Sequence, residues 1–236
     1  LMSIALLASF LLVVGVRAWL RHLNLTHLKL YGHTVPPGFE GVVDPALLAK
    51  MSDYTVENST VGFLESMLDN ILLLLFLFWG WIEVYDRWIA SLTPSFLLGG
   101  VLFTLVLMYA RTLVELPFSL YRTFRLEAKY GFNTMTLRLW ATDLLKSLAI
   151  GTVLTTVTVL AALALVQASP AWWWLWVWLF LLCFSIVLMY LAPVVIEPLF
   201  FKFEPLSVEG FEDRIKAVMA KAGLTVSRVF QVDASR

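Results

Sequence analysis

Five stretches of about 20 mostly apolar residues dominate the chain. Each is long enough to cross a bilayer, since a helix that rises about 1.5 Å per residue needs about 20 residues to cross a hydrocarbon core of about 30 Å. We therefore predict an all-α polytopic membrane protein with five transmembrane helices. The expected spans lie at about residues 1–20, 63–85, 96–116, 144–166 and 172–196.

The composition supports a membrane protein. Of the 236 residues, 60% are hydrophobic and only 14% are charged, whereas about a quarter of a soluble domain is charged. The 17 basic and 17 acidic residues leave no net charge, so no nucleic-acid partner is expected. The single cysteine, Cys183, lies within an apolar stretch. We therefore expect the lipid bilayer as a partner and no disulfide framework.

Basic residues are unevenly distributed between the two sides of a five-span protein. They gather in the segments 17–62, 111–146 and 197–236, whereas the opposite loops carry only Arg87. Lysine and arginine stay on the cytoplasmic side during insertion. The sequence therefore predicts an N-terminus outside and a cytoplasmic C-terminus, in a bacterial inner membrane or the eukaryotic endoplasmic reticulum.

The composition changes after Pro205. Apolar residues then recur at helical spacing, Gly223 is suited to end a helix, and 224–232 is rich in valine and phenylalanine and is typical of a strand. No other segment looks like a partner strand. We therefore expect 1–206 to form the transmembrane region and 207–236 to begin a cytoplasmic α/β domain that stays incomplete. The alternative is a frayed terminal segment.

Two pairs of ionisable residues lie at the cytoplasmic ends of spans. Glu65 and Asp69 are four residues apart; they either belong to a polar helix start, where carboxylates favour the positive helix N-terminus, or line a hydrated cavity. Arg111 and Glu115 have the same spacing, which favours an ion pair on one helix face. Pro117 is expected to end or kink that helix.

Asp143 and Lys146 stand at the expected start of the fourth span, with Thr142 as its candidate N-cap. The three histidines, His22, His27 and His33, are all expected in the first cytoplasmic loop. A zinc proteinase uses two histidines one helical turn apart with a glutamate between them, in the motif H-E-x-x-H. That string does not occur in the sequence, so the histidines are expected to be surface residues and no catalytic group is expected in this chain.

Three strings in a fixed order carry a family resemblance. They are L-P-F-S-L-Y at 116–121, E-A-K-Y-G-F-N at 127–133 with D-L-L-K at 143–146, and I-E-P-L-F-F-K-F-E-P-L at 196–206. Together they resemble the N-terminal membrane region of the type I CAAX prenyl protease family, which are integral-membrane zinc metalloproteases. Phe201 stands where that family usually has asparagine.

The resemblance implies a seven-helix barrel enclosing a chamber, of which five helices are expected here. It implies a zinc endopeptidase that cleaves membrane-associated or prenylated peptides, with zinc ligands beyond Arg236. The partners would be a peptide or prenylated-peptide substrate, the bilayer and the remainder of the protease polypeptide, and this chain alone is expected to be inactive. Ten residues are expected to line the substrate chamber or brace the zinc domain, and none is expected to bind metal: Glu65, Asp69, Arg111, Glu115, Glu127, Lys129, Asn133, Asp143, Lys146 and Pro198.

Two other classes of protein fit five spans. The main alternative is a non-catalytic five-span scaffold or channel that lacks the protease half. A transporter is disfavoured because the sequence shows neither internal repeats nor a pair of broken helices. A downstream H-E-x-x-H motif in the coding frame would favour the protease, whereas a stop codon after Arg236 would favour the scaffold.

Overall fold

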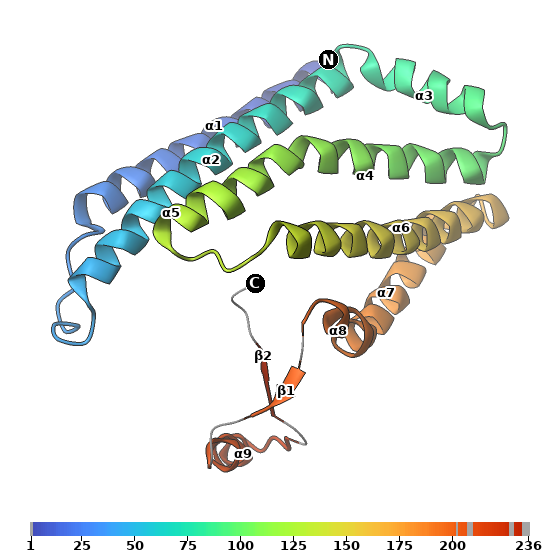
Figure 1. Ribbon diagram of the computed structural model, residues 1–236. Helices are drawn as coiled ribbons and strands as arrows, with labels where there is room; N and C mark the ends of the chain where they lie inside the picture. The colour runs from blue at the N-terminus through green and yellow to red at the C-terminus, as the bar shows by residue number, and fades with distance from the viewer. Residues whose placement is uncertain (1, 202, 207–209, 227–228, 233–236) are drawn as a thin grey trace. The chain divides into compact units, whose positions relative to one another are not determined.

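A computed structural model describes residues 2–201, 203–206, 210–226 and 229–232 (Figure 1). Lys202 of the third motif string and the basic residues Arg228 and Arg236 lie outside the described residues. The chain divides into two compact units, each described here by itself. One contains Leu1–Leu92 and Val106–Asn133, and the other contains Thr93–Leu105 and Thr134–Arg236.

The first unit is built from long helices. Helix α1 is Met2–Tyr31, α2 is Pro45–Phe78, and α3 is Trp81–Leu92. Helix α4, Phe96–Tyr121, contributes its second half and is followed by the π-helix η1, Arg122–Glu127, and the short α5, Ala128–Tyr130. Helices α1 and α2 pack against each other, and η1 packs against α2.

The boundaries of α2 differ from the second expected span, 63–85. The helix begins at Pro45, because the Asp44 side chain accepts a hydrogen bond from Ala46 N at 2.9 Å and proline is well suited to a first helical turn. It ends at Phe78, and Gly80 turns the chain with a φ of 80°. A polar stretch therefore extends this helix before the apolar one, and residues 81–85 belong to a separate helix.

Helices α1 and α2 approach closely where α1 ends. A Cβ atom on Gly32 would lie 2.2 Å from Ser52 Oγ, a distance at which no side chain fits. Ser52 is accordingly buried, with 5% of its surface exposed. Further along the pair, the Arg21 guanidinium lies 5.8 Å from the centre of the Phe63 ring, within cation–π range.

The second unit contains the first part of α4 and two further long helices. Helix α6 is Leu137–Ala168 and α7 is Trp173–Leu191, and the two pack together. The π-helix η2, Ala192–Ile196, and α8, Glu197–Phe200, continue from α7. A Cβ atom on Gly100 would lie 2.2 Å from Leu163 Cδ1, so the glycine allows α4 and α6 to approach closely.

Among the described residues, five helices are long and apolar enough to cross a membrane, which confirms the predicted fold class. They are residues 4–31, 45–78, 96–130, 137–168 and 173–200. Only four apolar residues among those described are buried: Ile89, Val101, Leu126 and Tyr130. The exposed surface is thus largely apolar, as expected where lipid replaces water as the solvent.

Of the two effects predicted for Pro117, ending the helix is wrong, and a kink stays a prediction. Helix α4 continues through Pro117 to Tyr121, and the widened π-turn η1 follows directly. The second π-turn, η2, itself contains a proline, Pro193, whereas η1 follows the proline of α4 by five residues. A proline lacks the N–H that the helix needs, and neighbouring turns with altered spacing can absorb the strain without ending the helix.

The C-terminal segment contains a small antiparallel sheet. Strand β1, Phe203–Pro205, pairs with β2, Phe230–Val232, and Phe203 lies opposite Val232. The prediction that no partner strand exists is therefore wrong. The strand β1 could not be recognised in the sequence, because three residues that include a proline show no strand pattern. Helix α9, Phe211–Lys221, ends before Gly223, whose φ is 73°, which confirms that glycine as the helix stop. The boundary at residue 207 stays a prediction.

Candidate functional site

Glu65 is held by an ion pair between two helical segments. Its carboxylate accepts a hydrogen bond from Arg122 Nη2 of η1. The side chains are 19% and 31% exposed, and Arg122 Nε is buried without a hydrogen-bond partner among the described residues. The interpretation of Glu65 as part of a helix start is wrong, because α2 begins about five turns earlier, at Pro45. A charge at this depth instead depends on its partner.

Asp69, Arg111 and Glu115 lie near that pair. The predicted ion pair within α4 is confirmed, since Arg111 Nε lies 2.7 Å from Glu115 Oε1. Asp69 and Glu65 of α2 add favourable Coulombic interactions with Arg111. Opposite charges from the two helices therefore gather in one cluster, which is the arrangement that ionisable groups in spans require.

Lys129 of the E-A-K-Y-G-F-N string binds α2. Its Nζ donates to Glu57 Oε1, although the two residues are 72 positions apart. The ammonium also lies 5.2 Å from the ring centre of Tyr130, and Tyr130 itself is buried. The string is thus attached to α2 by one charge pair beside a buried aromatic residue.

An aromatic cluster completes this attachment. The Tyr54 ring contacts Tyr130 and Phe132 edge-on, at centroid distances of 5.6 and 5.2 Å. Lys50 Nζ lies 5.0 Å from the Phe132 ring centre. Edge-to-face aromatic contacts and cation–π contacts each contribute about 1 kcal/mol, so the cluster adds to the charge pair in holding the loop on α2.

The backbone of the same string makes a tight turn. Gly131 has a φ of 69°, a left-handed conformation that glycine adopts without strain. Phe132 N donates to the carbonyl oxygen of Glu127 at 2.9 Å. Of the predicted site residues, Glu127 thus contributes its backbone to the turn, and the half-buried Asn133 follows the turn at the end of this unit.

A cavity of about 510 Å³ lies beside these contacts, between α2 and the α4–η1 segment. It combines the Glu57 carboxylate and two hydroxyl groups with apolar side chains, which suits a ligand that has both polar and apolar parts. The lining residues are Glu57, Thr60, Val61, Leu64, Pro117, Phe118, Tyr121 and Leu126.

In the second unit, Lys146 joins two elements. Its Nζ lies 3.1 Å from Asp143 Oδ1 and donates to the Leu199 carbonyl oxygen at 2.8 Å. It also lies 5.7 Å from the Phe200 ring centre. The last carbonyl groups of a helix have no partner within it, so Lys146 satisfies one of these at the end of α8, which begins at Glu197 and has Pro198 in its first turn.

The predicted role of Thr142 as an N-cap is wrong. Helix α6 begins at Leu137, and Thr136 Oγ1 accepts from Leu139 N at 3.2 Å. Asp143 and Lys146 therefore lie inside the helix rather than at its start. Their ion pair is a contact within one face, and Lys146 reaches further to the other element.

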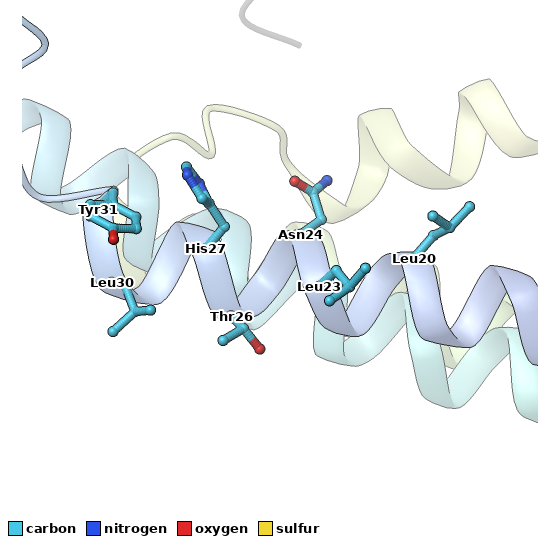
Figure 2. A pocket seen from close by; sticks show the side chains of 7 residues that line it. All are labelled: Leu20, Leu23, Asn24, Thr26, His27, Leu30 and Tyr31. Carbon is cyan, nitrogen blue, oxygen red and sulfur yellow. The ribbon is translucent and has the colours of Figure 1, made fainter.

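The prediction that all three histidines lie in a loop is wrong, because His22 and His27 belong to α1. The histidines do not form a metal site with one another. An open recess along α1 is lined by seven side chains of that helix alone, among them His27, whose ring lies 4.7 Å from that of Tyr31 (Figure 2). His33 Nε2 lies 2.9 Å from Asp53 Oδ1. Within the described ranges, no group of three or more histidine, cysteine, aspartate or glutamate residues could hold a metal ion. The described residues therefore do not fit a zinc site.

The sequence reasoning missed four residues of the first unit. Lys50, Tyr54 and Glu57 recur every three or four positions on α2, which is the spacing of one helix face. That signal is hidden because the polar stretch before residue 63 is expected to be a loop. Arg122 gives no comparable signal, since its partner is 57 residues away.

Together, the five long apolar helices and the charged clusters within them define a polytopic helical membrane protein. The chain matches the family described as CAAX prenyl protease N-terminal, five membrane helices, over residues 24–202. It therefore belongs to that family.

Relatives from distant organisms support the assignment. The chain is 32% identical over 155 residues to the probable CAAX prenyl protease 1 of Schizosaccharomyces pombe, a match that covers 64% of this chain and 33% of the relative. It is 27% identical to the CAAX prenyl protease 1 homolog of Arabidopsis thaliana, with 90% and 51% covered. It is 28% identical to the uncharacterized metalloprotease YhfN of Bacillus subtilis, with 93% and 56% covered.

A solved structure shares the fold. The crystal structure of S. mikatae Ste24p superposes with a TM-score of 0.84 at 25% identity, covering 97% of this chain and 54% of that one. The chain thus spans about half the length of most of the relatives it matches.

Proposed function

We propose that the chain is the membrane-embedded portion of a zinc-dependent endopeptidase. In the complete protein its spans would form part of the wall of a substrate chamber, and the substrate would be a membrane-associated or prenylated peptide. The proposal is supported most by the family match over residues 24–202. The names of the relatives, CAAX prenyl protease and metalloprotease, supply the reaction and the substrate class.

The contacts of the two units suggest what this chain adds to that enzyme. Lys129 and Glu57 fasten the E-A-K-Y-G-F-N string to α2, and Lys146 fastens the end of α8. We assign to these contacts the bracing of the segments that lead toward the zinc domain. Glu65, Asp69, Arg111 and Glu115 would present a charged surface to the water of the chamber. The cavity beside Glu57 is a candidate subsite for part of the substrate.

The residues that bind zinc would lie in another part of the complete polypeptide. The described residues do not fit a zinc site, and we expect the H-E-x-x-H ligands beyond Arg236, as the family resemblance implies. Residues 207–236 would begin that domain on the cytoplasmic side, with the N-terminus outside, as the distribution of lysine and arginine predicts.

Peptide cleavage by two polypeptides tests the proposal. One is the exact chain of residues 1–236, and the other continues through the downstream H-E-x-x-H motif. Both are reconstituted in phosphatidylcholine vesicles and given a farnesylated CAAX peptide, with and without a zinc chelator. The short chain should neither cleave the peptide nor hold stoichiometric zinc, whereas the long one should cleave it and stop when the chelator is added.

Two results would contradict the proposal. Cleavage by the short chain, proven pure by intact mass, would place the catalytic group within it. Absence of any downstream zinc motif in the coding frame would favour the five-span scaffold or channel instead.

A substitution tests the bracing role. Lys146→Met in the long polypeptide should lower cleavage while its zinc content stays unchanged. Arg138→Met, at an exposed residue of the same helix, serves as the matched control.

A further inference from the structure

Helix α3, Trp81–Leu92, is the most amphipathic element outside the spans, and no role follows for it from the family match. The sequence predicts a spanning segment to residue 85 and a short loop after it. Instead the chain turns sharply at Gly80, and α3 forms a separate helix that runs away from α2 (Figure 1). Its 12 residues make a helix of about 18 Å, which is too short to cross the hydrocarbon core.

One face of α3 packs on protein. Ile89 is 3% exposed, and the Tyr85 ring contacts Phe76 of α2 at a centroid distance of 5.8 Å. Ile82 on the same side is half-buried. These three residues recur at the three- and four-residue spacing of one helix face, so α3 has a fixed rotation about its own axis.

The opposite face is polar. Glu83, Asp86, Arg87 and Ser91 share it at helical spacing and are all exposed. Arg87 Nε donates to the Glu83 carbonyl oxygen at 3.1 Å. Two carboxylates and one guanidinium give this face no excess of positive charge, so it has no attraction for anionic lipid headgroups.

A third strip is apolar and is not covered by any described part of the chain. Its members are Trp81, Val84, Trp88 and Leu92, with exposures between 48% and 59%. In the chain, the strip follows Phe78 at the end of α2 and the adjoining Trp79, which are 39% and 76% exposed. An exposed apolar strip on a helix that directly follows a membrane span is suited to contact lipid.

We propose that α3 lies in the plane of the membrane interface as an anchor. The strip Trp81, Val84, Trp88 and Leu92 contacts the boundary between headgroups and acyl chains, while the carboxylates and Arg87 face water. The ends of α3 are tied to spans, because α2 ends at Phe78 and α4 begins at Phe96. Tryptophan favours this depth, and a helix with one apolar and one charged face binds there.

Site-specific labelling of the full chain tests this placement. In a Cys183→Ser background, an environment-sensitive fluorophore is attached at Val84→Cys on the strip or at Ala90→Cys on the polar side, in vesicles of phosphatidylcholine alone. Spin-labelled phosphatidylcholine, with the quencher near the headgroup, should quench the label at 84 about threefold more than the label at 90. Aqueous iodide should show the reverse order.

Leu92→Cys repeats the strip position should Val84→Cys fail to insert, with Ser91→Cys as its neighbour on the polar side. Equal iodide quenching at 84 and 90 would overturn the proposal, since α3 would then stand in water. Protection of the label at 84 from both quenchers would also overturn it, because protein, such as a second copy of the chain, would then cover the strip. Neither quenching measurement depends on proteolytic activity, so the placement of α3 can fail or hold independently of the proposed function.

Discussion

Arg122 and Lys146 each join segments that are far apart in the chain, 57 and 53 residues respectively, but they bind different kinds of group. Arg122 in the first unit binds a carboxylate, that of Glu65. Lys146 in the second unit binds a backbone carbonyl oxygen, that of Leu199. A carboxylate can be moved to the other partner by mutation, whereas a carbonyl group stays where the backbone puts it.

This difference predicts how each contact responds to substitution. Exchanging the two charges of an ion pair keeps their attraction, and removing one of them leaves the other desolvated and unpaired. Lys146 can exchange charges with its ion-pair partner Asp143, but the Leu199 carbonyl oxygen cannot take part in any exchange. Exchanging the two charges should therefore restore the stability of the first unit but not that of the second.

Arg122→Ala should have the largest effect. It leaves the Glu65 carboxylate, only 19% exposed, without its cation, and breaking such a pair costs about 3 kcal/mol. The free energy of unfolding in phosphatidylcholine nanodiscs measures the loss. The exchange Glu65→Arg with Arg122→Glu should recover most of it, and Arg125→Ala, an arginine of the same π-turn, should cost little. A double variant no more stable than Arg122→Ala would show that the charge pair is not what holds these helices.

Lys146→Met should come next, at about 2 kcal/mol, since a hydrogen bond to a charged donor is lost and the Leu199 carbonyl oxygen is left without it. Exchanging the charges, Asp143→Lys with Lys146→Asp, should not restore stability, because the carbonyl group needs a donor at position 146. Amide hydrogen exchange of residues 200 and 201 reports the loosening of the end of α8. Full recovery in the exchanged variant would contradict the comparison.

Gly131→Ala separates the backbone from the charge pairs of the first unit. With a φ of 69° at this position, an alanine is strained by about 1 kcal/mol, although Lys129 and Glu57 are unchanged. Thermal unfolding should show this loss, and Gly15→Ala, in a helix with open space around it, should be neutral or stabilising. Equal effects of the two alanines would mean that the turn at 131 does not require its left-handed conformation.

The smallest effect is expected in α9, outside the spans. The hydrogen bond from Lys216 to Glu212, followed by their Coulombic attraction, raises the pKa of Lys216 above its usual 10.5. A raised lysine pKa stabilises the folded helix fully below the ordinary value, and the gain is lost as the pH rises through the folded-state pKa. Amide exchange in α9 should therefore quicken above about pH 10.5 beyond its intrinsic pH dependence. Glu212→Gln should remove that extra step, and its persistence would assign it to another group.

The sequence was sufficient for the five spans, because a run of about 20 apolar residues is typical of a helix that crosses a bilayer. It was insufficient for the helix ends. Hydropathy reports where lipid is, and α2 continues through polar residues back to Pro45. That extension placed Glu65 in mid-helix and hid the face that Lys50, Tyr54 and Glu57 share.

The site was predicted where its contacts are local. The i,i+4 pair of Arg111 with Glu115 follows from helical spacing, and it is present. The partners of Glu65 and Lys129 lie 57 and 72 residues away, and no periodicity connects positions so distant. The pairing of β1 with β2 was missed as well, because each strand has only three residues, too few to show an alternating pattern.

The close contact between Gly100 of α4 and Leu163 of α6 restricts how α6 can move along α4. Leu163 fills the space that a methyl group at position 100 would take. A slide of one helical turn, about 5.4 Å, would move the Leu163 side chain away from the space beside Gly100 and against residues of α4 that are larger than glycine. Within this unit the two helices are therefore fixed in register, and any relative motion of α4 and α6 has to be a separation or a tilt.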